Sequence, residues 1–281
     1  MTGAMKKRKG RYAVIAILTL IVCIIVIFKI TRPYIPQNNS VESIAVFNIG
    51  NIIVNNYILK TNSGYIVIDT GYPNNFKRFR AGLDEHGIPL EEIEFILLTH
   101  AHNDHAGFLN ELLEATNAVL ILDKLAVERL LAGHNQWIGG ASGRLAEIFI
   151  RVMSFLGDSE KEFPPVILPS NAIIWDRETQ ILRKAGIPID IISLPGHTAD
   201  SIGFLTDYGK LFSGDATMNG FPSIRRNIIW IENLEDYKRS WDTMINSNAV
   251  RIFPSHGRPF DKSDLIRFRP YLDRIELRAM R

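Results

Sequence analysis

The chain has 281 residues, of which 46% are hydrophobic and 22% are charged, which excludes a disordered or fibrous protein and suits one large domain or two fused halves. The formal charge of +2 hides an asymmetry, because residues 1–34 contain seven basic residues and no acidic residue. Setting these residues aside leaves 25 basic against 30 acidic residues, a charge of −5, and a body of that sign argues against nucleic acid as a partner.

The first predicted element is an apolar run at residues 12–28, "YAVIAILTLIVCIIVIF", which follows the basic segment "KKRKGR". At 1.5 Å per residue the run spans roughly 25 Å, and Lys29 and Ile30 extend it to about the hydrocarbon thickness of a bilayer. A cleaved signal peptide and a buried core helix are the alternatives. A cleavage site needs small residues after the run, but residues 29–33 are "KITRP", so the sequence favours an uncleaved transmembrane anchor at 12–30.

The distribution of basic residues predicts the orientation of this anchor. Five basic residues precede the span and two follow it, so we expect residues 1–11 in the cytoplasm and the rest of the chain outside, as a single-pass protein of the cell membrane. Residues 31–43 form a linker, and residues 44–281 form the exterior domain. The only cysteine, Cys23, lies in the span, so a metal in the exterior domain must be bound through nitrogen and oxygen.

The exterior domain begins with β-rich runs at 44–49, 51–60 and 64–70, of which the first two are expected to be antiparallel. A helix at 76–87, a strand at 93–99, a helix at 105–116 and a strand at 118–123 continue in a βαβ rhythm. The helical, glycine-interrupted region from about 124 to 165 breaks this rhythm. We interpret it as an insertion, either a substrate lid in which His134 and Trp137 line a pocket or a surface hairpin.

Strands resume at 171–176, 189–194, 201–207 and 210–215, followed by a helix at 234–247, a strand at 250–254 and a final helix from about 262. The second half therefore repeats the rhythm of the first. This pattern predicts an α/β domain in which two sheets pack face to face with helices outside, each half of the chain giving one sheet.

Ligand-type side chains gather at the predicted strand ends. The stretch "THAHNDHAG" follows a buried strand and places four of them in one loop, from which several side chains can reach one point. Imidazole and carboxylate both bind divalent metal ions. Three more candidates follow later predicted strands, in "PGHT", "SGDA" and "PSHG". A single His or Asp beside glycine is more often a turn residue than a metal ligand. Because such residues recur at several strand ends, the sequence predicts one shared site. The candidates are His100, His102, Asp104, His105, His197, Asp215 and His256.

Five motifs occur along roughly residues 44 to 260, in the order "IDTG", "THAHNDHAG", "PGHTADS", "FSGDA" and "PSHGRPF". In these motifs and their order the chain resembles the metallo-β-lactamase-fold hydrolases. The resemblance implies an αββα sandwich of two mixed sheets with a two-metal site at one edge, usually zinc, with iron and manganese also occurring. Its full histidine set is most similar to the glyoxalase II and lactonase branches. Carried over by motif, one metal would bind His100, His102 and His197; the second would bind Asp104, His105 and His256; Asp215 would bridge both metals and Asp69 would orient the site.

The ligand set implied by this resemblance predicts the chemistry. Two dications lower the pKa of a shared water molecule and provide a hydroxide nucleophile, while Asp104 moves the proton. Asp69 and Thr198 are candidates for fixing the imidazole tautomers. We therefore expect a membrane-anchored binuclear hydrolase of a small ester-like substrate: a lactone, a thioester or a phosphodiester. The alternatives are an iron-dependent oxygenase or redox enzyme of the same fold, and a non-catalytic metal-binding domain.

Overall fold

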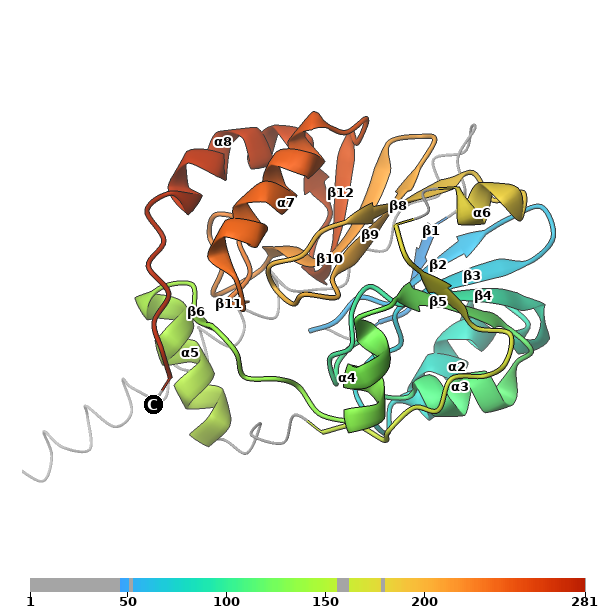
Figure 1. Ribbon diagram of the computed structural model, residues 1–281. Coiled ribbons are helices and arrows are strands. Elements are labelled where there is room, and N and C mark those ends of the chain that lie inside the picture. Colours follow the sequence, from blue (N-terminus) through green and yellow to red (C-terminus); the bar gives the residue numbers. More distant parts are fainter. Residues whose placement is uncertain (1–45, 51–52, 156–161, 178–179, 281) are drawn as a thin grey trace, which may run out of the picture.

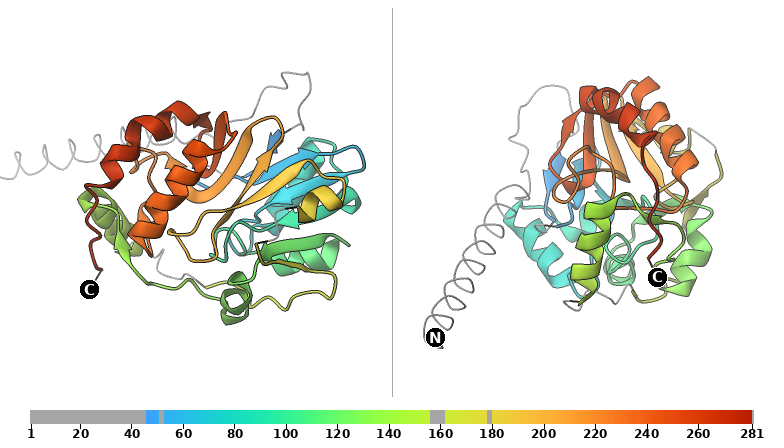
Figure 2. Two further views of the ribbon diagram at one scale, coloured as in Figure 1. Left: turned by 45° about the horizontal axis from the view of Figure 1, so that its top comes forward. Right: turned by 90° about the vertical axis from the view of Figure 1, so that its left-hand side faces the viewer.

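A computed structural model of the protein describes residues 46–50, 53–155, 162–177 and 180–280. The predicted cytoplasmic segment, membrane anchor and linker lie outside these ranges, and within them no helix has the length and hydrophobicity needed to span a bilayer. Two β-sheets pack face to face, and helices cover the outer face of each sheet (Figures 1 and 2). The predicted αββα sandwich is therefore confirmed for the domain that these residues form.

The first sheet comes from the first half of the domain. Its strand order is β1 (Val46–Asn48), β2 (Tyr57–Lys60), β3 (Tyr65–Ile68), β4 (Ile93–Leu97), β5 (Val119–Asp123) and β7 (Ile173–Trp175). Strands β1, β2 and β3 pair with one another in antiparallel direction, whereas β3, β4, β5 and β7 pair in parallel direction. Parallel neighbours need crossover connections. They run through α2 (Phe76–Glu85) and the short 3₁₀ helix η1 (Leu90–Glu92) between β3 and β4, through α3 (Leu109–Ala115) between β4 and β5, and through residues 124–172 between β5 and β7.

Two predicted elements of this half are shorter than expected, for reasons that concern the site. The strand at 51–60 begins only at Tyr57, because the chain just before it contacts the second sheet, where the Asn55 amide donates to Ser255 O at 2.8 Å. The helix at 105–116 begins only at Leu109, because the His105 and Ala106 amides donate to His102 O and hold these residues in a loop.

The second sheet comes from the second half, as predicted. Its order is β13 (Phe260–Asp261), β12 (Arg251–Gly257), β10 (Lys210–Asn219), β9 (Ile202–Thr206) and β8 (Ile189–Ser193). Only β10 and β12 run parallel, and α7 (Leu234–Asn246) connects them. Asn233 caps α7 by accepting the amides of Glu235 and Asp236. The helices α6 (Ile181–Lys184) and α8 (Lys262–Leu272) complete this half.

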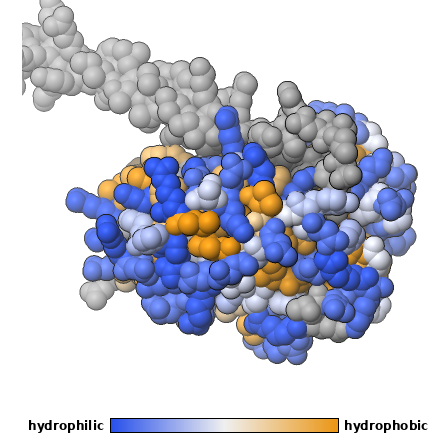
Figure 3. Space-filling view, turned by 90° about the horizontal axis from the view of Figure 1, so that it is seen from above, coloured by the Kyte–Doolittle hydropathy of each residue, from blue (hydrophilic) through white to orange (hydrophobic). Residues whose placement is uncertain are grey.

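The apolar core has three layers. Tyr57 and Ile66 from the first sheet meet Phe212 and Phe253 from the second, with the Tyr57 ring 5.1 Å from Phe212 and 5.7 Å from Phe253. Further buried clusters lie under α2 and α3 on one side, and under α7 and α8 on the other. On the face shown in Figure 3, hydrophobic side chains form small patches within a largely hydrophilic surface. Most apolar burial is therefore in the layers that fix the sandwich.

The region 124–165 contains two helices, α4 (Ala126–Ala132) and α5 (Arg144–Phe155), with a glycine-rich stretch between them, in agreement with the predicted helical, glycine-interrupted region. Its glycine-rich middle was predicted as a loop or hairpin turn but forms the strand β6 (Gly140–Ala141), which pairs with β11 (Trp230–Ile231). Gly139 makes this approach possible, because its φ is +90° and a Cβ there would lie 2.0 Å from Ile231 O. The region is therefore bound to the second half of the domain.

Candidate metal centre

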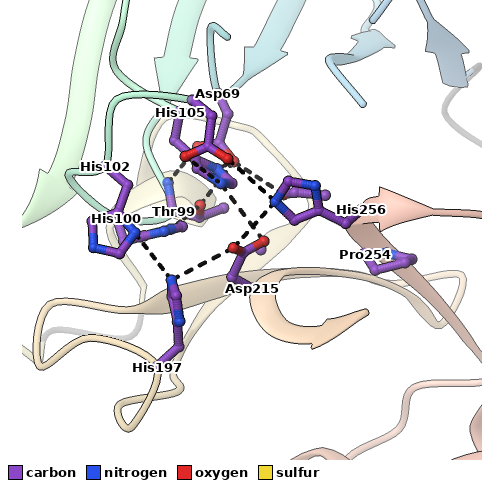
Figure 4. Close-up of polar contacts among 12 residues, drawn as sticks. Asp69, Thr99, His100, His102, His105, His197, Asp215, Pro254 and His256 are labelled. Atoms are coloured by element: carbon purple, nitrogen blue, oxygen red, sulfur yellow. Dashed lines mark hydrogen bonds and ion pairs between the residues drawn. The ribbon is translucent and has the colours of Figure 1, made fainter. Parts of the chain in front are cut away.

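The structure brings all seven candidate ligands together at one edge of the sandwich (Figure 4). Four of them occupy the loop between β4 and α3, and His197 lies in the loop between β8 and β9, as predicted. Asp215 and His256, in contrast, lie inside β10 and β12 and not after them. The predicted strand ends were too early, because the β10–β12 ladder continues through register shifts after Phe212 and Gly214.

Three buried histidines form the first cluster, His100, His102 and His197, with their donor atoms within 4.8 Å of one another. Nε2 of His197 lies 3.1 Å from Nδ1 of His102, and Nε2 of His100 is buried without a protein partner. Two nitrogens on one tetrahedral zinc ion would be about 3.3 Å apart. The cluster therefore fits the ligand set expected for one metal.

Asp104, His105 and His256 form the second cluster. Nε2 of His256 lies 3.3 Å from Asp104 Oδ2, and Nε2 of His105 lies 3.7 Å from Asp104 Oδ1. Nε2 of His105 is also buried and has no hydrogen-bond partner. These three residues match the set expected for a second metal.

Asp215 lies between the two clusters. Its Oδ2 is 3.5 Å from Nε2 of His197 and 3.3 Å from Nε2 of His256, and its Oδ1 is 3.6 Å from Nε2 of His105. Oδ1 makes no hydrogen bond although it is buried. Buried polar atoms without hydrogen-bond partners destabilise the fold, so several of them facing one point indicate a site for a bound cation. The buried histidine and aspartate clusters are consistent with a binuclear metal site.

The two clusters differ in charge. Burial and the neighbouring histidines hold the pKa of His100 and of His102 well below the usual value, so both rings are neutral. Burial alone would also lower the pKa of His105 and His256, but the nearby carboxylates raise both, that of His256 to about 10. The same ion pairs lower the pKa of Asp215 against the effect of its burial. A metal ion that binds the second cluster must therefore displace protons.

Asp69 orients the site as the sequence predicted. Its fully buried carboxylate accepts from the Thr99 amide at 2.7 Å, from the Thr99 hydroxyl at 2.8 Å and from Nδ1 of His105 at 2.9 Å. Its φ of +57° is uncommon for a residue with a side chain, and such strain is typical of functional sites. Thr198 does not share this role, because its hydroxyl pairs with that of Ser201 at 2.7 Å.

The other imidazoles are oriented by groups that sequence motifs do not reveal. Nδ1 of His197 lies 2.8 Å from Trp230 O, and Nδ1 of His256 lies 2.9 Å from Ile53 O. The hydroxyl of Thr99 lies 3.0 Å from Nδ1 of His100. Two of the three partners are backbone carbonyls, which any residue type supplies. Each contact leaves Nε2 of its ring directed at the site.

Two side chains from the middle of the 124–165 region, Asn135 and Trp137, pack beside the site. The side chain of Asn135 accepts the Asn103 amide at 2.8 Å and donates to the Asn103 side chain at 3.0 Å. Trp137 is 53% exposed and packs edge-on against Trp230 at 4.9 Å. His134, the other predicted pocket residue, is exposed and is not among the clustered ligands.

Comparison with known proteins agrees with this geometry. A beta-lactamase-like protein 2 homolog of Caenorhabditis elegans is 26% identical over 209 residues, which cover 74% of this chain and 57% of that protein. A probable metallo-hydrolase of Bacillus subtilis, YqjP, is 26% identical over 247 residues, which cover 76% of this chain and 69% of that protein. This chain thus spans less than two thirds of the first of these relatives.

Solved structures share the fold. The subclass B3 metallo-beta-lactamase BJP-1 of Bradyrhizobium japonicum superposes with a TM-score of 0.58 at 18% identity, covering 88% of this chain and 93% of that one. A metallo-beta-lactamase family protein of Thermus thermophilus gives 0.57 at 21% identity, covering 79% and 73%. The family model of the metallo-beta-lactamase superfamily matches residues 49–256, which is most of the chain and includes all seven clustered side chains. The chain therefore belongs to the metallo-beta-lactamase superfamily.

Proposed function

We propose that the protein is a membrane-anchored, binuclear metal-dependent hydrolase that acts outside the cytoplasm on a small ester-like substrate: a lactone, a thioester or a phosphodiester. The proposal is carried by the meeting of nitrogen and oxygen donors from four separate segments, several of them buried and unsatisfied. A structural zinc site is usually a closed tetrahedron of four ligands. Seven donors with one shared carboxylate suit two open metal positions better.

The two divalent ions, when bound, would supply the nucleophile by lowering the pKa of a shared water molecule and would polarise the substrate's carbonyl or phosphoryl oxygen. Asp104 would hold and move the proton. Its side chain is 14% exposed, against 5% for Asp215, so it is the more accessible carboxylate. Its Oδ2 pairs with Nε2 of His256 at 3.3 Å, which keeps it ionised and able to accept a proton. The domain from residue 44 contains no cysteine, so no thiolate competes as nucleophile.

The donor set also bears on the metal. Imidazole nitrogen and carboxylate oxygen suit zinc, and iron and manganese bind to similar sets. We propose zinc because the first cluster consists of three buried imidazoles. Iron in the purified protein, together with oxygen-dependent turnover, would favour the oxygenase alternative.

The test combines metal analysis with a substrate panel. The full-length protein in detergent is assayed for zinc, iron and manganese, and for hydrolysis of lactones, thioesters, phosphodiesters and β-lactams. We expect two metal ions per chain, and a loss of hydrolysis by about 100-fold or more in Asp104→Ala. Asp84→Ala, an exposed aspartate on α2, is the matched control and retains activity. Full activity in Asp104→Ala would remove its proposed role, and a metal-free active protein would refute the function.

The membrane location is supported by the apolar run at 12–28, its basic flank and the net negative charge of the remaining chain. Protease added to intact cells is expected to digest the domain. A domain that is cut only after lysis would reverse the proposed orientation.

A further inference from the structure

A second buried group of charged side chains lies beside the three-histidine cluster. Arg129 of α4 forms a two-pronged pair with Glu232, at 2.8 Å from Nη1 to Oε1 and 2.9 Å from Nη2 to Oε2. Its Nε lies 3.3 Å from Asp200 Oδ1. The three side chains are 8%, 6% and 0% exposed, respectively. We call Arg129, Glu232 and Asp200 the arginine clamp.

Both carboxylates of the clamp also accept a backbone amide from the loops that supply the first cluster. Asp200 Oδ2 accepts the amide of Ala101, which stands between His100 and His102, at 2.8 Å. Glu232 Oε2 accepts the amide of Ala199, two residues after His197, at 2.9 Å. The Glu232 amide in turn donates to Gly196 O at 2.9 Å. Each carboxylate therefore contacts Arg129, Glu232 through hydrogen bonds and Asp200 through an ion pair, and also accepts a backbone amide from a ligand loop.

We infer that the arginine clamp is a positioning device for the first metal, which holds the His100–His102 loop and the His197 loop at the separation that metal binding needs. The inference rests on the proposed two-metal function. Only arginine suits this position, because its planar fork can engage two carboxylates at once, whereas lysine offers a single point charge. One cation facing two anions also leaves one net negative charge beside the three-histidine cluster, which favours a dication there.

The arrangement also gives α4 a role. This helix belongs to the 124–165 region and, apart from Arg129, packs on β5 of the first sheet. Through Arg129 it reaches Glu232, which follows β11 more than 100 positions later in the chain. The region would therefore support the metal centre as well as border it.

The test measures Zn²⁺ affinity with a competing chromophoric chelator, in the full-length protein that also carries His105→Ala. This change breaks the other two groups of potential ligands, which both contain His105, so that among the described residues the three-histidine cluster is the one complete triad. In this background we expect Arg129→Lys to weaken zinc binding moderately and Arg129→Met by about 10–100-fold. Amide hydrogen exchange of the zinc-free protein supplies a readout that does not depend on metal or activity. The Ala101 and Ala199 amides should exchange faster in Arg129→Met, while those of the β3 strand should not.

Two controls separate positioning from general damage. Arg183→Met removes another arginine that pairs with two carboxylates, Asp190 and Asp207, but lies on α6 away from the site. Leu265→Ala opens a cavity under α8 and lowers stability without touching either loop. Both should bind zinc as tightly as the background protein. Glu232→Gln, which keeps the volume of the side chain, covers the case in which Arg129→Met fails to fold, and is also expected to weaken zinc binding.

The outcomes are distinguishable. If the parent protein binds no zinc, the proposed function fails. If the parent binds zinc and folded Arg129→Met and Glu232→Gln bind it equally well, the arginine clamp has no positioning role. Weakening of zinc binding by the same factor in Leu265→Ala would likewise overturn the inference, because lost stability alone would explain it.

Discussion

Replacing Asp69 tests how the ligand loop is held, because this carboxylate accepts three hydrogen bonds at 2.7–2.9 Å in a fully buried position. In Asp69→Ala the Thr99 hydroxyl can still pair with Nδ1 of His100, 3.0 Å away. The Thr99 amide and Nδ1 of His105 have no such substitute. The donors of two short bonds would therefore be left unsatisfied, and the buried Ser255 hydroxyl would lose its longer contact of 3.4 Å to Asp69 Oδ2.

Each unsatisfied buried donor costs about 1–3 kcal/mol, so the two together should lower the free energy of unfolding by about 2–6 kcal/mol. An alanine at a φ of +57° adds about 1 kcal/mol of backbone strain. Asp69→Asn is the matched control. Asparagine tolerates this backbone conformation and keeps one acceptor oxygen, so it should leave about one donor unsatisfied and lose about 1–3 kcal/mol.

The assay is urea unfolding of the zinc-free proteins at neutral pH, followed by zinc titration of each variant. We expect Asp69→Ala to lose more stability than Asp69→Asn, and both to bind the second zinc about 10–100-fold more weakly, because His105 loses its orienting partner. A loss below about 1 kcal/mol in Asp69→Ala, or an equal loss in both variants, would refute the hydrogen-bond argument.

Three further predictions concern packing, substrate and pH. Gly214→Ala should lower the free energy of unfolding by about 1–3 kcal/mol and reduce the amount of bound zinc, because a Cβ at position 214, where φ is +53°, would lie 2.8 Å from Thr99. Gly143→Ala, which has open space around the added Cβ, is the control in the same unfolding assay. Trp137→Ala should change KM for apolar substrates without changing metal content, since this ring is exposed and contacts no ligand side chain. The zinc-free domain should lose stability as pH rises from about 6.5 towards 10, because folding raises the pKa of His256 to about 10 and the stabilisation by its bound proton is lost over that range. Urea unfolding measures the free energy of unfolding across this pH interval. A profile that does not change with pH would contradict the prediction.

The clustering of the seven candidate side chains could be predicted from sequence, because metal binding constrains residue type within short motifs. The assignment of each half of the chain to one sheet also followed, since apolar runs such as "FILL" at 95–98 are short and alternate with helical patterns. Strand ends were less predictable. Asp215 and His256 belong to strands whose ladder continues across irregular register, and local pattern carries no signal for pairing between strands.

The supports of the site were largely hidden from sequence. Trp230 and Ile53 act through backbone carbonyls, so their side chains give no indication of the role. Arg129 and Glu232 are 103 positions apart, and each reads alone as an ordinary charged surface residue. Asp69 was found because it lies in a motif. Contacts between distant segments need the fold before they can be recognised.

The uneven charge of the centre has a consequence for metal loading. In the first cluster, burial keeps His100 and His102 neutral, so protons compete little for their lone pairs. In the second, the carboxylates raise the pKa of His105 and His256, so protons and metal compete directly. Lowering the pH should therefore release the second metal before the first. Dialysis at stepwise lower pH, with zinc counted per chain, should show a plateau near one ion, and simultaneous loss of both ions would mean that the two clusters titrate as one unit.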